Sequence, residues 1–238
     1  MKITIGYLFY DLLNLYGESG NILALDFALK KQGIDTEIKY LSIYDDIDFS
    51  LLDFIYIGCG TENNQKIVLD FLKKYKKDIL QYVMNNNFIL ATGNSIELFG
   101  KHIKLLDGTI EECLGTFSYY TERTEKRLVS ECIFKHDDFD EKILGFENDC
   151  GITKDNTSPL FTIIKGYGEV KDYGVEGFIN NNFYGTYLLG PILARNPKFL
   201  EYIVKKLVTS IDAYFEFKPF ELEFSTVAHD KFLEKYNK

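Results

Sequence analysis

Strand-like and helix-like segments alternate along the N-terminal half of the chain, and this alternation limits the possible folds more than any other feature of the sequence. Short apolar runs suited to strands lie at Lys2–Phe9, Thr36–Ile43, Phe54–Gly58 and Phe88–Thr92. Apolar residues at helical spacing fill Asn21–Lys31 and Gln65–Val83, and Ser95–Phe99 begins a further helix. Such alternation predicts a mostly parallel sheet with helices on both faces.

The C-terminal half changes character and is rich in strand-like segments. These segments lie at Arg127–Phe134, Lys142–Asn148, Leu160–Lys165, Val175–Asn180 and Phe183–Leu188. Turn-forming residues follow at Asp149–Gly151, Gly166–Gly168 and Asn180–Asn182. A helix at Pro197–Tyr214 and an amphipathic tail at Val227–Tyr236 end the chain. No linker separates the halves, so we expect one domain over residues 1–238: a three-layer α/β fold with a β-rich C-terminal part.

Charge and composition exclude several classes of function. The 238 residues carry a formal net charge of −9, the wrong sign for a protein that binds a nucleic-acid backbone. No apolar run reaches the roughly 20 residues of a membrane span, and none has the pattern of a signal peptide. We therefore expect a cytoplasmic protein with reduced cysteines. The three His and four Cys are scattered without a CxxC pair, so we expect no metal site and no cofactor.

Two turns after expected strands could hold chemistry, because ligands of open parallel sheets bind at the carboxyl ends of the strands. Gly58–Gln65 follows the third strand, and its glycines would let backbone N–H groups approach a substrate oxygen closely. On spacing alone, a plain strand-to-helix turn explains it better. The second turn, at Gly93, has the outline of a nucleophile elbow, but glycine supplies no nucleophile.

These turns belong to a longer series of stretches in a fixed order. The series runs through Asp11–Gly17, Gly20–Ile22, Gly58–Gln65, Leu98–Gly100, Gly145–Asn148, Glu176–Gly177, Gly185–Leu193 and Asn196–Pro197. In this it resembles the class I (triad-type) glutamine amidotransferases of the cobyric acid synthase (CobB/CobQ-like) branch, and within them the glutaminase subunits of lipid II isoglutaminyl synthase. The resemblance covers nearly the whole chain and implies a flavodoxin-like sheet.

The resemblance also implies a reaction whose central residues are replaced here. Family members use a Cys at the elbow as nucleophile and a His before Gly-Pro as base, and these positions fall on Gly93 and Leu189. Asn94 and Glu97 replace a Gly and a substrate-holding Gln of the same motif. The glycine-rich oxyanion loop has become Gly58–Thr61, with Gly58 and Gly60 retained. After Gly145–Asn148, the family's His-Gly-Gly is Asp149-Cys150-Gly151.

Other residues could have taken over the chemistry or the binding. Cys59 is the most interesting substitute nucleophile, although a small buried loop residue is the commoner role for such a cysteine. Glu62 and Glu97 could form an acid–base pair. Ser95 more plausibly caps the short helix than acts as a hydrolase serine. The family's substrate-binding Arg falls near Arg123 and Arg127; Arg127 matches better, and a surface salt bridge explains it equally well.

The sequence therefore predicts a catalytically inactive relative of a glutaminase that works by binding. The resemblance implies a Mur-ligase-like partner protein, and glutamine or a cell-wall precursor as ligand, for a subunit that supports amidation of the D-glutamate of the peptidoglycan stem. Two alternatives stay open: an amidohydrolase with relocated chemistry at Cys59, and a small-molecule sensor with a reshaped pocket.

Overall fold

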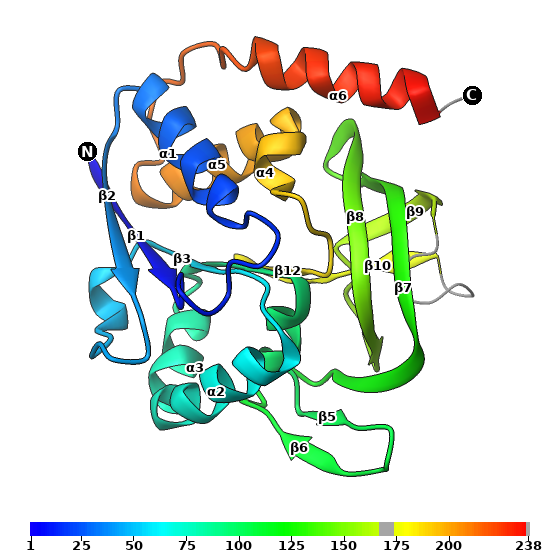
Figure 1. The fold of residues 1–238 in the computed structure, drawn as a ribbon. Helices are drawn as coiled ribbons and strands as arrows, with labels where there is room; N and C mark the ends of the chain where they lie inside the picture. The colour runs from blue at the N-terminus through cyan, green and yellow to red at the C-terminus, as the bar shows by residue number, and fades with distance from the viewer. Residues whose placement is uncertain (167–173, 237–238) are drawn as a thin grey trace.

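The computed structural model describes residues 1–166 and 174–236. Its centre is a six-stranded sheet in the order β11-β12-β4-β3-β1-β2, parallel except where β11 meets β12 (Figure 1). The strands span Lys2–Leu8 (β1), Asp35–Leu41 (β2), Phe54–Ile57 (β3), Phe88–Thr92 (β4), Phe178–Asn180 (β11) and Phe183–Thr186 (β12). The expected mostly parallel α/β sheet is confirmed. Because β1 lies between β2 and β3, the strand order reverses there, and a ligand crevice is expected at the carboxyl ends.

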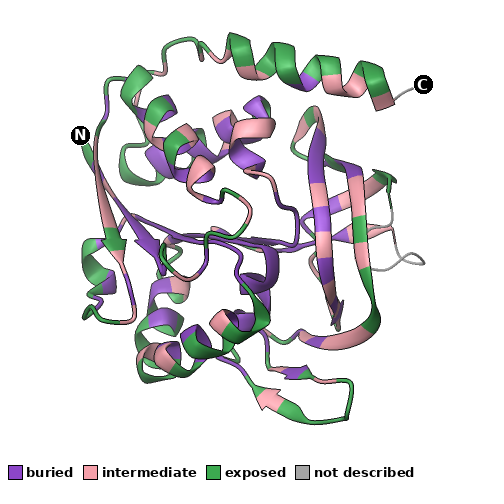
Figure 2. Ribbon diagram, in the orientation of Figure 1, coloured by how far each residue is buried: buried purple, intermediate pink, exposed green. Residues whose placement is uncertain are grey.

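Helices cover both faces of this sheet, because its strands are apolar on both sides. On one face Ile5, Tyr56 and Leu90 pack against α1 (Ser19–Lys31), α4 (Ile192–Arg195) and α5 (Pro197–Ile211). On the other, Ile57 and Ala91 pack against α2 (Glu62–Leu72) and α3 (Lys76–Met84). Figure 2 shows the buried strands running between these helix layers.

The prediction of one continuous helix over Gln65–Val83 was wrong. The helical stretch begins earlier, at Glu62, where the Thr61 hydroxyl accepts the Asn64 amide at 3.2 Å. It is then interrupted by the 3-10 turn Lys73–Tyr75. Tyr75 leaves helical geometry because its hydroxyl accepts the Ile47 amide (3.0 Å) and its ring packs on Phe49.

The segment after β4 also differs from the expected helix. Gly93–Phe99 is a wholly buried 3-10 helix and not an α-helix. Ser95 is not its cap. The Ser95 hydroxyl donates to the carbonyl oxygens of Ile57 (3.0 Å) and Thr92 (2.9 Å), which ties the turn to β3.

A second sheet stands beside the central one and forms a wall over its carboxyl edge (Figure 1). Its strands are β5 (His102–Lys104), β6 (Ile110–Glu112), β7 (Tyr120–His136), β8 (Phe139–Lys154), β9 (Phe161–Lys165) and β10 (Val175–Glu176). The turn expected at Asp149–Gly151 was wrong: these residues continue β8, and Glu147, Asp149 and Gly151 point to its buried side. The strand pair has a register shift between Arg123 and Leu128, opposite this stretch.

The strand expected over Val175–Asn180 is two strands in different sheets. Gly177 separates them at φ +68°, where a Cβ would lie 2.5 Å from the Gly185 carbonyl oxygen, so only glycine lets the chain cross between sheets here. The expected strand Phe183–Leu188 ends at Thr186. Of the expected turn Gly166–Gly168, only Gly166 is described; the rest lies outside the described residues.

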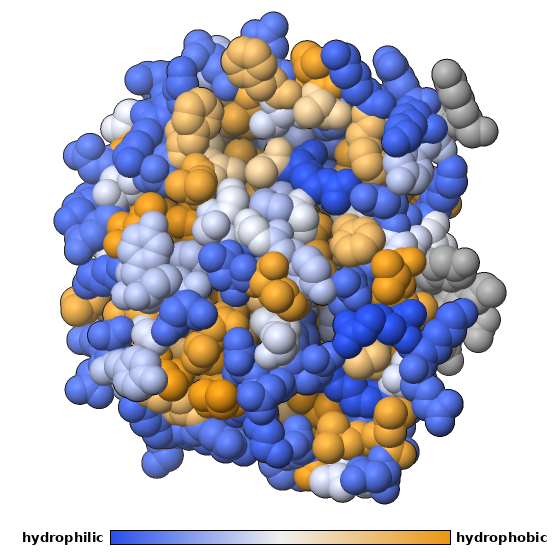
Figure 3. Space-filling view, viewed as in Figure 1, coloured by the Kyte–Doolittle hydropathy of each residue, from blue (hydrophilic) through white to orange (hydrophobic). Residues whose placement is uncertain are grey.

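The C-terminal helices have boundaries that differ from the expected ones. Helix α5 ends at Ile211, and α6 begins at Glu223 and runs to Tyr236. Helix α6 is largely exposed, and its one buried side chain, His229, places Nε2 2.7 Å from the Lys142 carbonyl oxygen at the end of the β7–β8 hairpin. Figure 3 shows hydrophilic residues over much of this face, with apolar residues gathered near α1 and the start of α6 and again around α2 and α3. Within the described residues no helix has the length and hydropathy needed to cross a bilayer.

Candidate functional site

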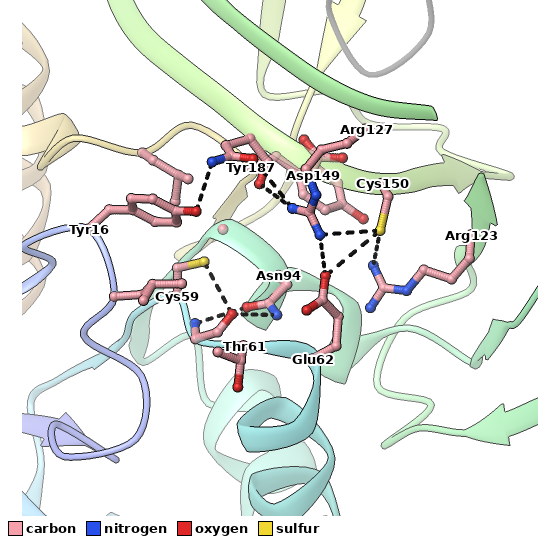
Figure 4. A pocket seen from close by; sticks show the side chains of 15 residues that line it. Tyr16, Cys59, Thr61, Glu62, Asn94, Arg123, Arg127, Asp149, Cys150 and Tyr187 are labelled. Atoms are coloured by element: carbon pink, nitrogen blue, oxygen red, sulfur yellow. Dashed lines mark hydrogen bonds and ion pairs between the residues drawn. The ribbon is translucent and has the colours of Figure 1, made fainter. Parts of the chain in front are cut away.

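A cavity of about 270 Å³ lies at the carboxyl ends of the central strands. The loops that follow β1, β3, β4 and β12 form its base, and β7 and β8 of the second sheet form one side (Figure 4). Its volume is close to the lower end, roughly 300 Å³, of small-molecule sites. The expected location at the strand ends therefore holds a real cavity.

Gly93 lies at the bottom of this cavity, directly after β4, with φ +61°. A Cβ atom at this position would contact Cys59 Cβ and would lie 2.5 Å from Cys59 Sγ and 2.9 Å from Leu189 Cδ2. Real Cβ atoms do not approach other heavy atoms so closely. The backbone therefore has the left-handed geometry of an elbow, and two neighbouring side chains occupy the space that a side chain at position 93 needs.

Leu189 reaches Gly93 from β12, which borders β4 on the side away from β3. It follows β12, is 1 % exposed, and exchanges two backbone hydrogen bonds with Phe146 of β8 (2.8 and 3.3 Å). These bonds hold Leu189 between the central sheet and β8 of the second sheet. An aliphatic side chain thus stands where the resemblance implies a base.

The loop after β3 has its polar groups bonded within the protein. Gly60 N–H donates to Asn94 Oδ1 (3.2 Å), and Asn94 Nδ2 donates back to the Gly60 carbonyl oxygen (3.0 Å). Both atoms of the side-chain amide are therefore used, and so is the Gly60 amide. Gly58 does not line the cavity; it packs behind it against Leu13 and Glu18. The amide that could stabilise an oxyanion already has an acceptor.

Glu97 lies fully buried just beneath the cavity, paired with Arg123. Arg123 Nη1 and Nη2 donate to Glu97 Oε1 (2.8 Å) and Oε2 (2.7 Å), which is a two-pronged pair. Gln65 Nε2 donates to Glu97 Oε2 (2.5 Å), and Tyr187 donates to Oε1 (3.2 Å). Burial raises the pKa of Glu97, and Arg123 opposes this by favouring the charged form.

The sequence favoured Arg127 over Arg123 as a binding residue, and the structure places both at the cavity in different settings. Arg123 is 9 % exposed and engaged by Glu97. Arg127 is 44 % exposed at the cavity mouth, where Nη2 lies 2.5 Å from Glu62 Oε1. Glu62 and Glu97 are therefore each paired with a separate arginine, and the structure does not bring them together as an acid–base pair.

Cys59 lines the cavity, close to the turn as its place in the oxyanion loop predicts, but its surroundings do not activate it. Burial, with the nearby carboxyl groups of Glu18, Glu97 and Asp149, raises the pKa of the thiol to about 12, although a hydrogen bond with the Asn94 backbone opposes the rise. Sγ lies 3.7 Å from the Gly60 carbonyl oxygen. None of the three histidines is among the described residues that line the cavity. A thiolate is therefore strongly disfavoured at neutral pH.

Asp149 is the cavity residue that the sequence reasoning missed as a site. It projects from the buried side of β8, is 7 % exposed, and lines the cavity (Figure 4). Burial, with smaller contributions from Glu147 and Glu97, raises its pKa to about 8, although the Gly151 amide and Arg123 oppose the rise. Asp149 stands in a stretch that aligns with the family, which could have marked it as a site residue. The composition of Asp149-Cys150-Gly151 is typical of a turn, however, and so did not predict a strand position that faces inward.

The side chains at the site do not form a metal-binding group. Among residues 1–166 and 174–236, no cluster of three or more His, Cys, Asp or Glu residues is arranged to hold a metal ion. The four cysteines are all free thiols in the structure. Residues at the cavity are arranged for hydrogen bonding and charge pairing.

Comparisons with known proteins agree with this architecture. The family model of the CobB/CobQ-like glutamine amidotransferase domain matches residues 4–197. A lipid II isoglutaminyl synthase (glutamine-hydrolyzing) subunit GatD of Streptococcus pneumoniae is 33% identical over 198 residues, covering 82% of this chain and 76% of that protein. The GatD subunit of Staphylococcus aureus is 30% identical over 237 residues, covering 100% and 97%. A probable cobyric acid synthase of Methanococcus maripaludis is 27% identical, and the match covers 71% of this chain and 36% of that protein.

Solved structures extend the likeness in fold. PurLQS from Thermotoga maritima superposes with a TM-score of 0.54 at 15% identity, covering 91% of this chain and 100% of that chain. The glutaminase domain of Trypanosoma brucei CTPS with bound acivicin gives a TM-score of 0.56 at 9% identity, covering 91% and 96%. At these identities the likeness concerns the fold alone.

Proposed function

The chain belongs to the CobB/CobQ-like glutamine amidotransferase family, and we propose that it is a non-hydrolysing member that acts as a binding or regulatory subunit. Its similarity to GatD subunits extends over the full chain. The proposal concerns what remains of the family's function when the central residues of the reaction are replaced. Residues 1–238 would act as one domain, because one hydrophobic core joins Ile5 and Tyr56 of the central sheet to Phe134 and Phe161 of the second.

The packing around Gly93 carries this proposal. In the family a cysteine side chain would have to project from this position, and here Cys59 and Leu189 fill the space that it needs. Leu189 at the expected base position cannot accept a proton. The nucleophile and the base are thus replaced together, and the vacated volume is closed by side-chain packing.

The oxyanion loop supports the same interpretation. Stabilising a tetrahedral intermediate requires donors aimed at the place where its negative oxygen forms. The Gly60 amide instead donates to Asn94, which is fixed by a second hydrogen bond to the same residue. Glutamine hydrolysis would require this pair of bonds to break.

Hydrolysis of glutamine by Cys59 is the alternative, because this thiol lines the cavity beside Gly93. Its surroundings speak against it. Burial and three carboxyl groups oppose ionisation of the thiol, and Sγ is hydrogen-bonded to the Gly60 carbonyl oxygen, which is not a base.

Release of glutamate and ammonia from glutamine tests the proposal directly. We expect no release above the spontaneous rate from the purified chain, and none from Cys59→Ser. Release by the unmodified chain that disappears in Cys59→Ser would overturn the proposal and establish the relocated chemistry. Release that survives in Cys59→Ser would overturn it as well and place the reaction on another residue.

A restoration series identifies what blocks the reaction. The double variant Gly93→Cys with Leu189→His leaves Cys59 in contact with the new side chain, so we expect it to be inactive. Adding Cys59→Gly removes that contact, and this triple variant is the one expected to gain measurable turnover. The gain should be small, because Asn94 still occupies the Gly60 amide and Glu97 stands where the family has Gln. Full activity of the double variant would contradict the packing argument.

The partner is proposed from the relatives' names, which describe subunits of lipid II isoglutaminyl synthase. A Mur-ligase-like protein in the cytoplasm would be bound by this chain, which would stabilise it or compete with an active subunit. Affinity purification of the tagged chain from native extract, with mass spectrometry, should recover such a ligase. Purified material that contains no ligase of this class would contradict the partner role.

A sensor role is the second candidate, and the 270 Å³ cavity favours it. Thermal-shift measurements with glutamine, glutamate and cell-wall precursors distinguish it from a purely protein-binding role. A ligand that raises the melting temperature without being hydrolysed supports the sensor.

A further inference from the structure

Carboxyl groups outnumber arginines at the cavity once the buried Glu97 beneath it is counted. Four charged residues line it: Glu62, Arg123, Arg127 and Asp149. Arg127 is paired with Glu62, and Arg123 is paired with the buried Glu97 beneath the cavity. Two ion pairs are therefore complete, and Asp149 is the carboxyl group that remains without a basic partner among the described residues.

Asp149 is held in place and directed at the cavity. Its side chain accepts one hydrogen bond, from the Gly151 amide to Oδ1 (3.1 Å), and no other hydrogen bond or ion pair joins it to the described residues. Because the residue is 7 % exposed, water outside the cavity cannot solvate it well. A nearly buried carboxyl group that faces a cavity and has no basic partner is suited to hold a proton or to pair with a cation from a ligand.

The charged neighbours of Asp149 do not provide it with a basic partner, because two of them are acidic and the third, Arg123, is paired with Glu97. Glu147 faces it from the same strand, Glu97 from the 3-10 helix, and Arg123 from β7. Arg123 lowers the pKa of Asp149 least among these influences, because its guanidinium is engaged by Glu97. In the empty cavity the pKa of Asp149 is therefore about 8, and the group is mostly protonated at neutral pH.

We propose that the cavity binds a ligand through a compact organic ammonium group, which pairs with Asp149. Leu15 and Leu189 provide apolar surface beside it for the carbon part of the ligand. The inference deepens the proposed function and rests on it in one respect, namely that the ligand stays intact. It names the chemical class that this member binds, through a residue by which it departs from the family stretch.

Binding would move one proton. The protonated carboxyl of Asp149 loses its proton to solvent, and the resulting carboxylate accepts N–H hydrogen bonds from the ammonium group, whose own protons stay in place. Affinity should therefore rise about tenfold per pH unit below pH 8 and level off above it. Near pH 10, where a primary amine loses its charge, affinity should fall again.

Three molecules of one shape test the charge requirement: n-propylammonium chloride, n-propanol and sodium propionate. Melting temperatures of the full chain are compared at equal ionic strength, with sodium chloride as reference, and binding is then measured by calorimetry at pH 7 in phosphate and in MOPS, a buffer that carries no primary ammonium group. We expect a shift with propylammonium alone, and a heat that differs between the buffers because a proton is released. Tighter binding of propionate would overturn the proposal and make the cavity an anion site at Arg127.

Asp149→Asn supplies the decisive variant, with Asp137→Asn on the exposed β7–β8 turn as its matched control. Asn keeps the shape and removes the charge, so propylammonium affinity should fall more than about tenfold. The control should bind as the unmodified chain does. Unchanged affinity in Asp149→Asn would overturn the proposal, provided that its melting temperature shows a folded protein. Ammonia release from glutamine is measured on the same samples, so that hydrolysis, which would refute the proposed function, is seen separately from ammonium binding.

Discussion

The floor and the wall of the cavity use their polar groups in opposite ways. The floor comprises Cys59, Gly60, Gly93, Asn94 and Leu189; the wall comprises Arg127, Asn148, Asp149 and Cys150. On the floor, side chains fill the space over Gly93 and Asn94 bonds the Gly60 amide. On the wall, Asp149 keeps a carboxyl oxygen for a ligand. Reaction chemistry and ligand recognition are thus placed on different elements, and one can be absent while the other persists.

Arg123 connects the two regions, and its removal should have the largest effect on stability. In Arg123→Ala the buried Glu97 loses its partner, which typically costs about 3–5 kcal/mol. Protonation of Glu97, whose pKa burial already raises, should limit the loss to about 3 kcal/mol. Urea unfolding measures this. In the double variant with Glu97→Ala the loss should be smaller than the sum of the single losses; additive losses would show that floor and wall are independent.

Gly93→Ala tests how tightly the floor is filled. The new Cβ meets Cys59 and Leu189 in a left-handed backbone conformation, so we expect a loss of about 2–3 kcal/mol in the free energy of unfolding. Gly108→Ala is the control, because Gly108 has φ +85° and no heavy atom lies within 4 Å of the place that a Cβ would take. That variant reports backbone strain alone, and Cys59→Gly should recover part of the loss in Gly93→Ala. Equal losses at both glycines would mean that the floor has room.

The pH dependence of stability reports on the wall. The pKa of Asp149 is about 8 in the folded chain, against an ordinary aspartate value of 3.8, so between these values the folded state holds a proton that the unfolded state has lost. Stability should therefore fall as pH rises from about 4 to about 8. Asp149→Asn should reduce this slope, with the remainder due to Glu97 and Glu147, whose pKa values burial also raises. An unchanged slope would show that Asp149 is charged and paired in the empty cavity.

Arg127→Gln should have the smallest effect. Its pair with Glu62 is about half exposed on both sides, so solvent screens it and the loss of stability should stay below about 1 kcal/mol. Thermal unfolding of this variant, beside Arg123→Ala, separates the mouth from the buried centre. A loss as large as that of Arg123→Ala would show that the exposed pair is structurally essential.

Much of the fold could be predicted from the sequence, because the central strands are short apolar runs between amphipathic helices. The prediction failed where distant contacts overrule local pattern. Tyr75 interrupts a helical stripe because its hydroxyl bonds Ile47, and Gly177 divides one strand-like segment between two sheets. Asp149–Gly151 has turn-like composition, but its alternate side chains are required on the buried side of β8.

The site could be predicted less completely than the fold. Motif order pointed to the turn at Gly93, yet three positions far apart in sequence meet there, and no local pattern reveals that contact. Arg127 matched the family better than Arg123, although Arg123 is the buried partner of Glu97. Asp149 lacks a basic partner because Arg123 and Arg127 pair with Glu97 and Glu62, and the sequence does not show which residues form these pairs.

The contact among Cys59, Gly93 and Leu189 also constrains how this lineage can change. A single substitution that put cysteine at position 93 would meet both neighbours and destabilise the protein before any chemistry could be selected. The first step of any return would have to shrink Cys59, a change that brings no activity by itself. Because of this packing, a glycine that has replaced the nucleophile is easily retained. Single mutations that would restore a side chain at position 93 are disfavoured, because each would first reduce stability.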